Sequence, residues 1–290
     1  MANFTYHPFA GAINGKFTIN ANGDQVFFSQ GNLQYIGSAA TPYWKFADNQ
    51  WDILGTTTGQ DSGNSNVDRD LFGWGTSGYH DASDAYNVFY QPWSTSTETV
   101  NADYNYYGYG PSTNAASPNL TGSSANYDWG IYNPINNGGN QAGQWRTLTG
   151  GSSGEWYYIF NTRNTSSGIR YAKAQVAGVN GVILLPDDWS TSTYSLSSTN
   201  TYDVSFSSNT ISASQWTTLE NAGAVFLPAA SNRHGTSIYG VGSYGNYWSS
   251  SCDGRCFACS VFFNDHDPDV VVWLARHFGL SVRLVCPAEN

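Results

Sequence analysis

Hydrophobic and polar residues alternate along this chain in short segments, and no stretch keeps the 3.6-residue period of a long helix. The clearest example is formed by residues 16–20 and 25–29, which flank a turn that contains Asn22 and Gly23. This dipeptide supplies the positive φ that a tight hairpin turn requires. The pattern therefore predicts an antiparallel hairpin near the N-terminus and further short strands after it.

Two apolar segments, residues 181–186 and 223–228, share a pattern in which a glycine opens the run and a proline closes it. Proline removes a hydrogen-bond donor from a sheet ladder. Both segments are therefore predicted to be buried strands that end at the proline.

Helix signals are few. Ser212 or Ser214 is a suitable N-cap for a short helix over residues 215–221, because Gly223 follows directly after its expected end. A second short helix is predicted to begin after Asp187 or Asp188.

Residues 55–154 form a long stretch rich in Gly, Ser and Asn that contains widely spaced tryptophans. Polar loops of this length are uncommon unless large side chains anchor them. We expect the loops to be fixed to the protein body by Trp74, Trp93, Trp129, Trp145 and Trp156. Because no charge run or proline-rich linker divides the chain, we predict one irregular α+β domain over residues 15–290, preceded by an N-terminal extension over residues 1–14.

Near the C-terminus, residues 260–264 and 281–285 alternate with the period of half-buried antiparallel strands. Val261 and Phe263 are predicted to face the core, as are Val282 and Leu284. Phe262 is then expected to point outward.

Composition narrows the possible partners. The chain has 290 residues with 11 Trp, 20 Tyr and 15 Phe, which is enough apolar area for a folded core. Its formal net charge is −10, and binding to a phosphate backbone requires clustered Lys and Arg, so nucleic acid is excluded. No run approaches the ~18 consecutive apolar residues of a membrane span, so no membrane insertion is predicted.

The last quarter of the chain mixes a regular framework with residues that follow no structural pattern. All four cysteines and three of the five histidines lie from His234 onward. The C-x3-C-x2-C spacing from Cys252 to Cys259 matches no compact zinc site. Asp265, Asp267 and Asp269 imitate the start of a calcium loop, but Val270 and Arg276 stand where an EF-hand requires Gly and Glu. We therefore predict no metal and no cofactor.

Six segments, taken in order, resemble the variable proteins of diversity-generating retroelements in gut Bacteroidetes and their phages. They are residues 27–35 (FFSQGNLQY), 46–52 (FADNQWD), 70–78 (DLFGWGTSG), 227–230 (LPAA), 245–250 (GNYWSS) and 281–285 (SVRLV). The resemblance implies an irregular C-type lectin fold of the subtype shared with formylglycine-generating enzymes, with short antiparallel strands, few short helices and long loops.

The resemblance also implies a hypervariable region over about residues 231–280. In the family, a reverse transcriptase miscopies template adenines, so that Asn codons become codons for most residues other than Trp, Met, Lys, Gln and Glu. Residues 252–280 contain no Met, Lys, Gln or Glu, which agrees with this mechanism, whereas Trp273 is an exception.

Carried onto this sequence, the resemblance implies that the exchangeable side chains form one ligand-binding surface, supported by Trp248 and by the core residues of the C-terminal strands. The predicted ligand-binding residues are His234, Tyr239, Tyr244, Asp253, Arg255, Cys256, Phe257, Cys259, Phe262, Asp265, His266, Asp267, Asp269, Trp273, Leu274, His277 and Phe278.

These observations predict a non-enzymatic binding protein, an adhesin or a phage receptor-binding protein, with a protein or glycan receptor on a cell surface. Its expected location is a phage tail tip or a bacterial cell surface, and it could form oligomers. No enzyme is predicted, because the cysteines lie among residues that are free to vary and the histidines lack a recognisable partner motif. The alternative is a carbohydrate-binding lectin module, either with or without a requirement for calcium.

Overall fold

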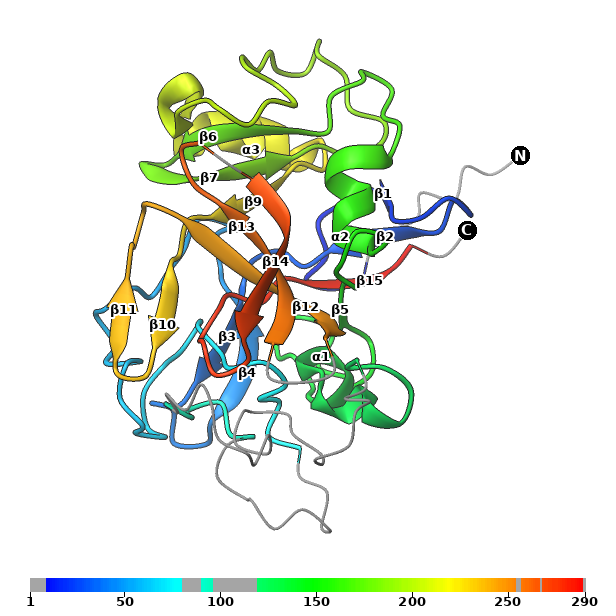
Figure 1. The fold of residues 1–290 in the computed structure, drawn as a ribbon. Helices are drawn as coiled ribbons and strands as arrows, with labels where there is room; N and C mark the ends of the chain where they lie inside the picture. Colours follow the sequence, from blue (N-terminus) through cyan, green and yellow to red (C-terminus); the bar gives the residue numbers. More distant parts are fainter. Residues whose placement is uncertain (1–8, 80–89, 96–118, 254–256, 267, 289–290) are drawn as a thin grey trace.

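The structure is a computed structural model that describes residues 9–79, 90–95, 119–253, 257–266 and 268–288. This part of the chain is α+β, with short strands in several small sheets and few short helices, as the sequence predicts (Figure 1). The helices are η1 (Gly122–Tyr127), α1 (Trp129–Tyr132), α2 (Glu155–Tyr157), η2 (Tyr158–Thr162), η3 (Phe206–Ser208) and α3 (Ala213–Asn221).

The strands form two four-stranded sheets, one three-stranded sheet and two hairpins among the described residues. The first four-stranded sheet has the order β1 (Phe17–Thr18), β2 (Gln25–Phe28), β15 (Leu284–Pro287), β5 (Arg146–Thr147). The second has the order β8 (Thr210–Ile211), β6 (Tyr171–Val176), β7 (Val179–Leu184), β9 (Val225–Pro228). The three-stranded sheet has the order β12 (Gly245–Cys252), β13 (Phe257–Phe263), β14 (Pro268–Ala275). The hairpins are β3 (Leu33–Ile36) with β4 (Tyr43–Phe46) and β10 (Asn232–His234) with β11 (Ser237–Tyr239).

Three hydrophobic clusters form the core. The central cluster includes Phe17, Phe28, Trp156, Val182, Leu184, Val225, Leu227, Tyr247, Val261, Phe263 and Val285. The tryptophan cluster includes Trp44, Phe72, Trp74, Trp129, Trp145, Trp248, Ala258, Val282 and Leu284. The helix cluster includes Ala174, Val176, Ile183, Trp189, Trp216, Leu219 and Phe226.

The predicted N-terminal hairpin is present. Phe17 of β1 pairs with Val26 of β2, and Gly23 in the turn has a φ of 87°. β15 lies between β2 and β5, which joins the last described strand to the first hairpin.

The prediction that residues 281–285 form a half-buried strand is wrong in one respect. Residues 281–285 are buried on both faces, and β15 begins only at Leu284. Arg283, expected on an exposed face, is fully buried and donates to the Phe226 carbonyl oxygen and to Gln50 Oε1. The central cluster, with Val285, covers one face of this segment and the tryptophan cluster, with Val282 and Leu284, covers the other, so alternation alone did not show that both faces were covered.

The two predicted apolar strands are confirmed as the neighbours β7 and β9, and Gly181 pairs with Pro228. The predicted helix is α3, and Ser212 is its N-cap. Its hydroxyl oxygen accepts from the Gln215 N–H at 3.2 Å, and the Gln215 side chain accepts from the Ser212 N–H at 2.9 Å. This reciprocal capping box fixes the start of the helix.

The second predicted helix is absent, because residues 187–188 form a turn. Instead of capping a helix, the Asp187 carboxylate accepts from the Thr18 N–H and from Arg163, each at 2.8 Å. The aspartate therefore joins distant segments, which is a role that local sequence does not reveal.

The tryptophans of the long loops do anchor them, as predicted. Trp74, Trp129, Trp145 and Trp156 are fully buried, and Trp93 is partly buried against the tryptophan cluster. The Trp74 indole N–H donates to the Ser249 carbonyl oxygen at 2.7 Å, which fixes its loop directly to β12.

The predicted extension over residues 1–14 is described only from residue 9. Ile13 is buried in the central cluster, and its N–H donates to the Phe28 carbonyl oxygen at 2.8 Å. This part of the extension therefore packs with the domain.

No helix in the described part of the chain is long and apolar enough to cross a membrane.

Candidate ligand-binding surface

The predicted hypervariable segment folds into the hairpin β10–β11 and the sheet β12–β13–β14. A bridge from Ser231 to Gly245 connects the hairpin to the start of β12, and a bridge from Arg233 to Gly279 connects it to the segment after β14. Arg233 is fully buried, and its guanidinium donates to the carbonyl oxygens of Gly235 and Ser94. The bond to Ser94 holds the hairpin against another part of the chain, whereas the bond to Gly235 fixes the turn of the hairpin itself.

The register of β13 and β14 decides which side chains share a face. Residues 257–260 pair without interruption with residues 275–272, and a register shift follows between Ser260 and Phe262. Paired residues lie on the same face of a sheet, and successive residues on opposite faces.

The sheet separates two hydrophobic clusters. Tyr247, Val261 and Phe263 belong to the central cluster, whereas Trp248 and Ala258 belong to the tryptophan cluster on the opposite face. All the residues that the sequence predicted as supports of the surface are buried, namely Trp248, Val261, Phe263, Val282 and Leu284.

Two large side chains on β13 and β14 are strongly exposed, Phe257 at 40% and Trp273 at 42%. Phe257 pairs with Ala275, and Cys259 pairs with Trp273, so the two aromatic residues are diagonal neighbours on one face. We call them the Phe257–Trp273 patch.

Phe262 does not join this patch. It lies five residues after Phe257 on the same strand, so its side chain points to the opposite face. The single apolar patch expected from the sequence is therefore divided between the two faces of β13, because an odd spacing along a strand reverses the side. Leu274, which pairs with Ala258, shares the face of Phe262 and is half-buried against the tryptophan cluster.

Phe262 and Tyr244 form a second pair of aromatic residues. The Tyr244 ring lies 5.9 Å from the Phe262 ring, and burial, with a smaller effect of Tyr239, raises the pKa of Tyr244. Tyr239 is 51% exposed and Val241 is 42% exposed in the adjoining turn. We call these four residues the Tyr239–Phe262 strip.

Acidic side chains lie at both ends of β13. Asp253 is exposed before the strand, and its Oδ1 accepts from the Phe257 N–H at 3.3 Å. Asp265 and His266 are exposed after it. Asp265 Oδ1 accepts from the Phe206 N–H at the start of η3, and His266 Nδ1 lies 3.1 Å from Asp203 Oδ1 in the segment before it.

The expectation that Cys259 is displayed at the surface is wrong, because its side chain is fully buried. Its Sγ accepts from the Gly151 N–H at 3.1 Å. A Cβ added to Gly150 would meet Cys259 Cβ and Sγ at 2.8 Å, so the loop packs directly on this position. Only a small side chain fits there.

His277 is also buried rather than displayed. Its ring lies 5.1 Å from that of His234 and 4.8 Å from that of Phe278, and both neighbours are half-buried. Burial, assisted by the nearby His234 and Arg233, lowers the pKa of His277 to about 4. At neutral pH, His277 therefore supports the surface from beneath and does not form part of it.

Three predicted residues, Arg255, Cys256 and Asp267, lie outside the described residues. Asp269 pairs with Phe262 in the sheet, and its side chain is not among those described. Within the described part of the chain, no group of three His, Cys, Asp or Glu side chains is arranged to hold a metal ion.

Sequence reasoning missed Val241 as an exposed residue. It lies between Gly240 and Gly242, whose φ values are 71° and 78°. A single apolar residue between two such glycines indicates a turn tip, and this signal was present in the sequence.

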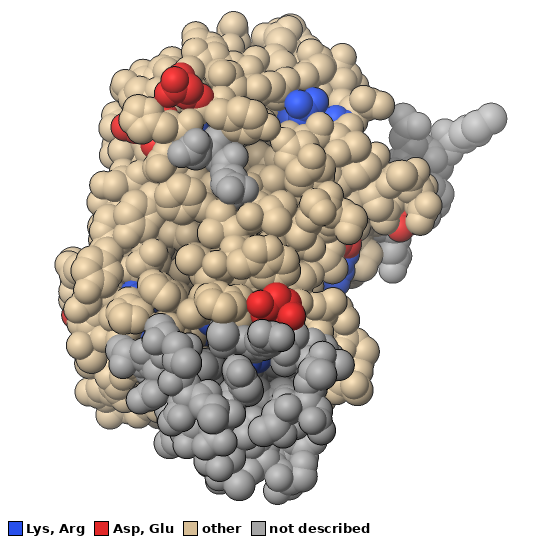
Figure 2. Space-filling model, viewed as in Figure 1, with Lys and Arg blue, Asp and Glu red and all other residues tan. Residues whose placement is uncertain are grey.

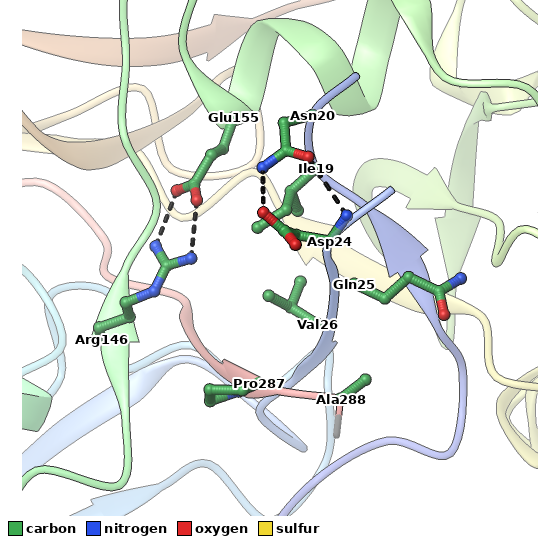
Figure 3. Close-up of a pocket in the computed structure, with 9 residues that line it drawn as sticks. All are labelled: Ile19, Asn20, Asp24, Gln25, Val26, Arg146, Glu155, Pro287 and Ala288. Atoms are coloured by element: carbon green, nitrogen blue, oxygen red, sulfur yellow. Dashed lines mark hydrogen bonds and ion pairs between the residues drawn. The ribbon is translucent and has the colours of Figure 1, made fainter. Parts of the chain in front are cut away.

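The described pockets lie away from this surface. One, of about 290 Å³, is lined by β2, the end of β15 and α2, and contains Asp24, Arg146 and Glu155 (Figure 3). The Arg146 guanidinium forms two 2.7 Å hydrogen bonds with the Glu155 carboxylate, so these charges largely compensate each other. None of the predicted ligand-binding residues lines the pocket.

No protein family matches the chain, and no curated protein and no solved structure matches it significantly. Function is therefore inferred from the residues of the C-terminal sheet and the surface that they form.

Proposed function

We propose that this protein is a non-enzymatic receptor-binding protein that displays one version of an exchangeable surface on its C-terminal sheet. The fold would be a C-type lectin fold of the formylglycine-generating-enzyme subtype, and the surface would be diversified by a retroelement. Its place would be a phage tail tip or a bacterial cell surface.

The observation that carries the proposal is the concentration of exposed apolar side chains. Eight large hydrophobic side chains are exposed in the described part of the chain. Four of them lie in the 35-residue segment 239–273. They form two groups, the Phe257–Trp273 patch and, in the Tyr239–Phe262 strip, Tyr239 with Val241. An exposed apolar patch bordered by charge, as Phe257 and Trp273 are by Asp253, is typical of a protein-binding surface.

The buried residues beneath the surface are consistent with exchange of the exposed side chains above them. Trp248, Val261 and Phe263 are fully buried and hold the sheet from both faces. Exposed side chains on such a rigid base contribute little to folding. Affinity would come from desolvating Phe257 and Trp273, and exposed Asp253 and Asp265 would reject partners that bring negative charge to the rim.

The test is binding of the fluorescently labelled protein to a panel of intact gut bacteria, measured by flow cytometry. We expect Phe257→Ser combined with Trp273→Ser to reduce binding at least about ten-fold, because aromatic anchors dominate such interfaces. The matched control is Tyr43→Ser with Tyr132→Ser, which removes two equally exposed aromatics far from the C-terminal sheet in sequence. Equal loss in both double variants would contradict the proposal.

The same assay separates the proposal from the carbohydrate-binding alternative. Periodate treatment of the cells destroys glycans, and a chelator removes calcium. Loss of binding after either treatment, with retention after protease treatment, would favour a lectin.

The proposed diversification by a retroelement can be tested separately, in the DNA that neighbours the gene. We expect a reverse transcriptase gene and a near-copy of the segment that encodes residues 231–286, differing only at adenines. A genome without such a copy would remove the retroelement from the proposal and leave the binding surface.

A further inference from the structure

We propose that the receptor is a protein that adds an extended strand to the outer edge of β14, alongside residues 272–275. This inference rests on the function proposed above and specifies the chemistry of the partner. In the described part of the chain, β14 pairs only with β13, so its outer edge is not covered by another strand.

An edge strand directs alternate main-chain N–H and C=O groups outward, where another strand can pair with them. Proteins usually protect such edges with Lys, proline, a bulge or a short strand. Residues 270–275 read VVVWLA and contain no charge and no proline. Pro268 and the register shift both precede Val272, so along the four regular pairs that follow, no other strand of the described residues pairs with the outer edge.

The side chains along this edge suit an extended apolar partner. Val272 and Leu274 are half-buried and Trp273 is exposed. β-branched and aromatic residues form the favourable cross-strand pairs of antiparallel sheets. In the view of Figure 2, most of the described surface is formed by residues that are neither acidic nor basic.

Charge specifies the ends of the partner strand. Asp253 is exposed near one end of the β13–β14 pair and Asp265 near the other. Arg276, the first charged residue after β14, is buried with its guanidinium 5.7 Å from the Trp74 ring centroid. The exposed rim formed by the described residues is therefore acidic, and the partner strand carries Lys or Arg on both sides of an apolar centre.

Strand addition also fits an exchangeable surface. Main-chain groups of the edge are unchanged when side chains are replaced, so they supply affinity that every version of the protein shares. The exchanged side chains beside the edge, such as Phe257, then supply specificity.

A proline scan of the edge tests this inference. Proline is tolerated in an edge strand where the replaced N–H points outward and disrupts the sheet where it points inward. Adjacent residues alternate, so one of Val272→Pro and Trp273→Pro should keep the wild-type melting temperature. Serine at the same position is the control, because it keeps the main-chain N–H and removes the side chain.

The probe is the bacterial panel described above, before and after protease treatment of the cells. We expect the folded proline variant to bind at least about ten-fold more weakly than its serine counterpart, because a main-chain bond is lost and the ring blocks the edge. Protease treatment of the cells should abolish wild-type binding.

A folded proline variant that binds as well as its serine counterpart would overturn strand addition and leave the proposed function intact. If both proline variants unfold, the protease treatment of the cells tests the inference instead. Binding of the wild-type protein that survives this treatment would show that the receptor is not a protein strand. A wild-type protein that binds no bacterium in the panel would overturn the proposed function, and this inference with it.

Discussion

Two sheets of this protein border the same central cluster but are covered differently. In β8–β6–β7–β9, Val182 and Leu184 face the central cluster, Ile183 faces the helix cluster, and α3 packs on that side. All four residues of β9 are buried. The sheet β12–β13–β14 also lies between two clusters, yet its outer strand exposes Trp273.

The comparison shows how covering the faces of a strand constrains its side chains. Where both faces are covered, each side chain has a fixed volume to fill and substitution is costly. Where one face of an outer strand is exposed, the side chains on that face do not have to fill a fixed volume, and they are available for binding.

The sharpest test of this comparison replaces one tryptophan in each sheet region. Trp216→Ala empties a fully buried site in the helix cluster and should lower the free energy of unfolding by about 3–5 kcal/mol. Trp273→Ala removes an exposed ring and should lower it by about 0.5 kcal/mol or less. Urea denaturation of both variants measures the difference, and similar losses would show that β14 is packed like β9.

A smaller effect is expected within the C-terminal sheet itself. Cys259→Phe inserts a large ring beneath Gly150 and Gly151 and should lower the free energy of unfolding by about 1–3 kcal/mol. Cys259→Ala is the matched control and should cost less, because it adds no volume. Thermal unfolding of the two variants provides the measurement. A phenylalanine variant as stable as the alanine variant would make position 259 an exchangeable site after all.

The smallest effect concerns pH, for which the two regions should respond with opposite sign. In the framework, Asp70 is buried, and its carboxylate accepts from the Leu54 N–H at 2.7 Å and from Gln60 Nε2 at 2.8 Å. Burial raises the pKa of Asp70 to about 6, above its unfolded value, so the folded protein binds the proton more tightly. Between pH 7 and 5, Asp70 should therefore increase stability by about 1 kcal/mol as the pH falls.

His277 has the reverse effect. Its folded pKa of about 4 lies below the unfolded value of 6.5, so the unfolded chain binds more protons in this range. Stability from this residue should decrease by about 2 kcal/mol between pH 7 and 5. Urea denaturation at both pH values should show that Asp70→Asn loses the stabilisation on acidification and that His277→Leu loses the destabilisation. Parallel pH profiles in both variants would contradict the assignment.

Local signals predicted much of the framework. The hairpin of β1 and β2, the strands β7 and β9 and the cap of α3 each depend on a few neighbouring residues, such as Gly23, Pro228 and Ser212. The failures involve distant partners. Asp187 was expected to cap a helix, but it binds Thr18 and Arg163 instead.

The sequence likewise predicted some features of the candidate surface and missed others. Its location near the C-terminus and the exposure of Phe257 agree with the residue pattern, whereas Trp273, the exception to that pattern, is exposed as well. Cys259 and His277 could not be recognised as buried, because the loop at Gly150 and the ring of His234 that cover them come from other parts of the chain.

The sequence by itself determined where short strands begin and end and which apolar residues supply the core, since turn residues and alternation act over a few positions. Only the tertiary structure decided which faces of the C-terminal strands are covered, and on which side Phe257 and Phe262 lie. The physical reason is that the face of a strand becomes core or surface through what packs on it. Here the packing elements are a loop and clusters from distant parts of the chain.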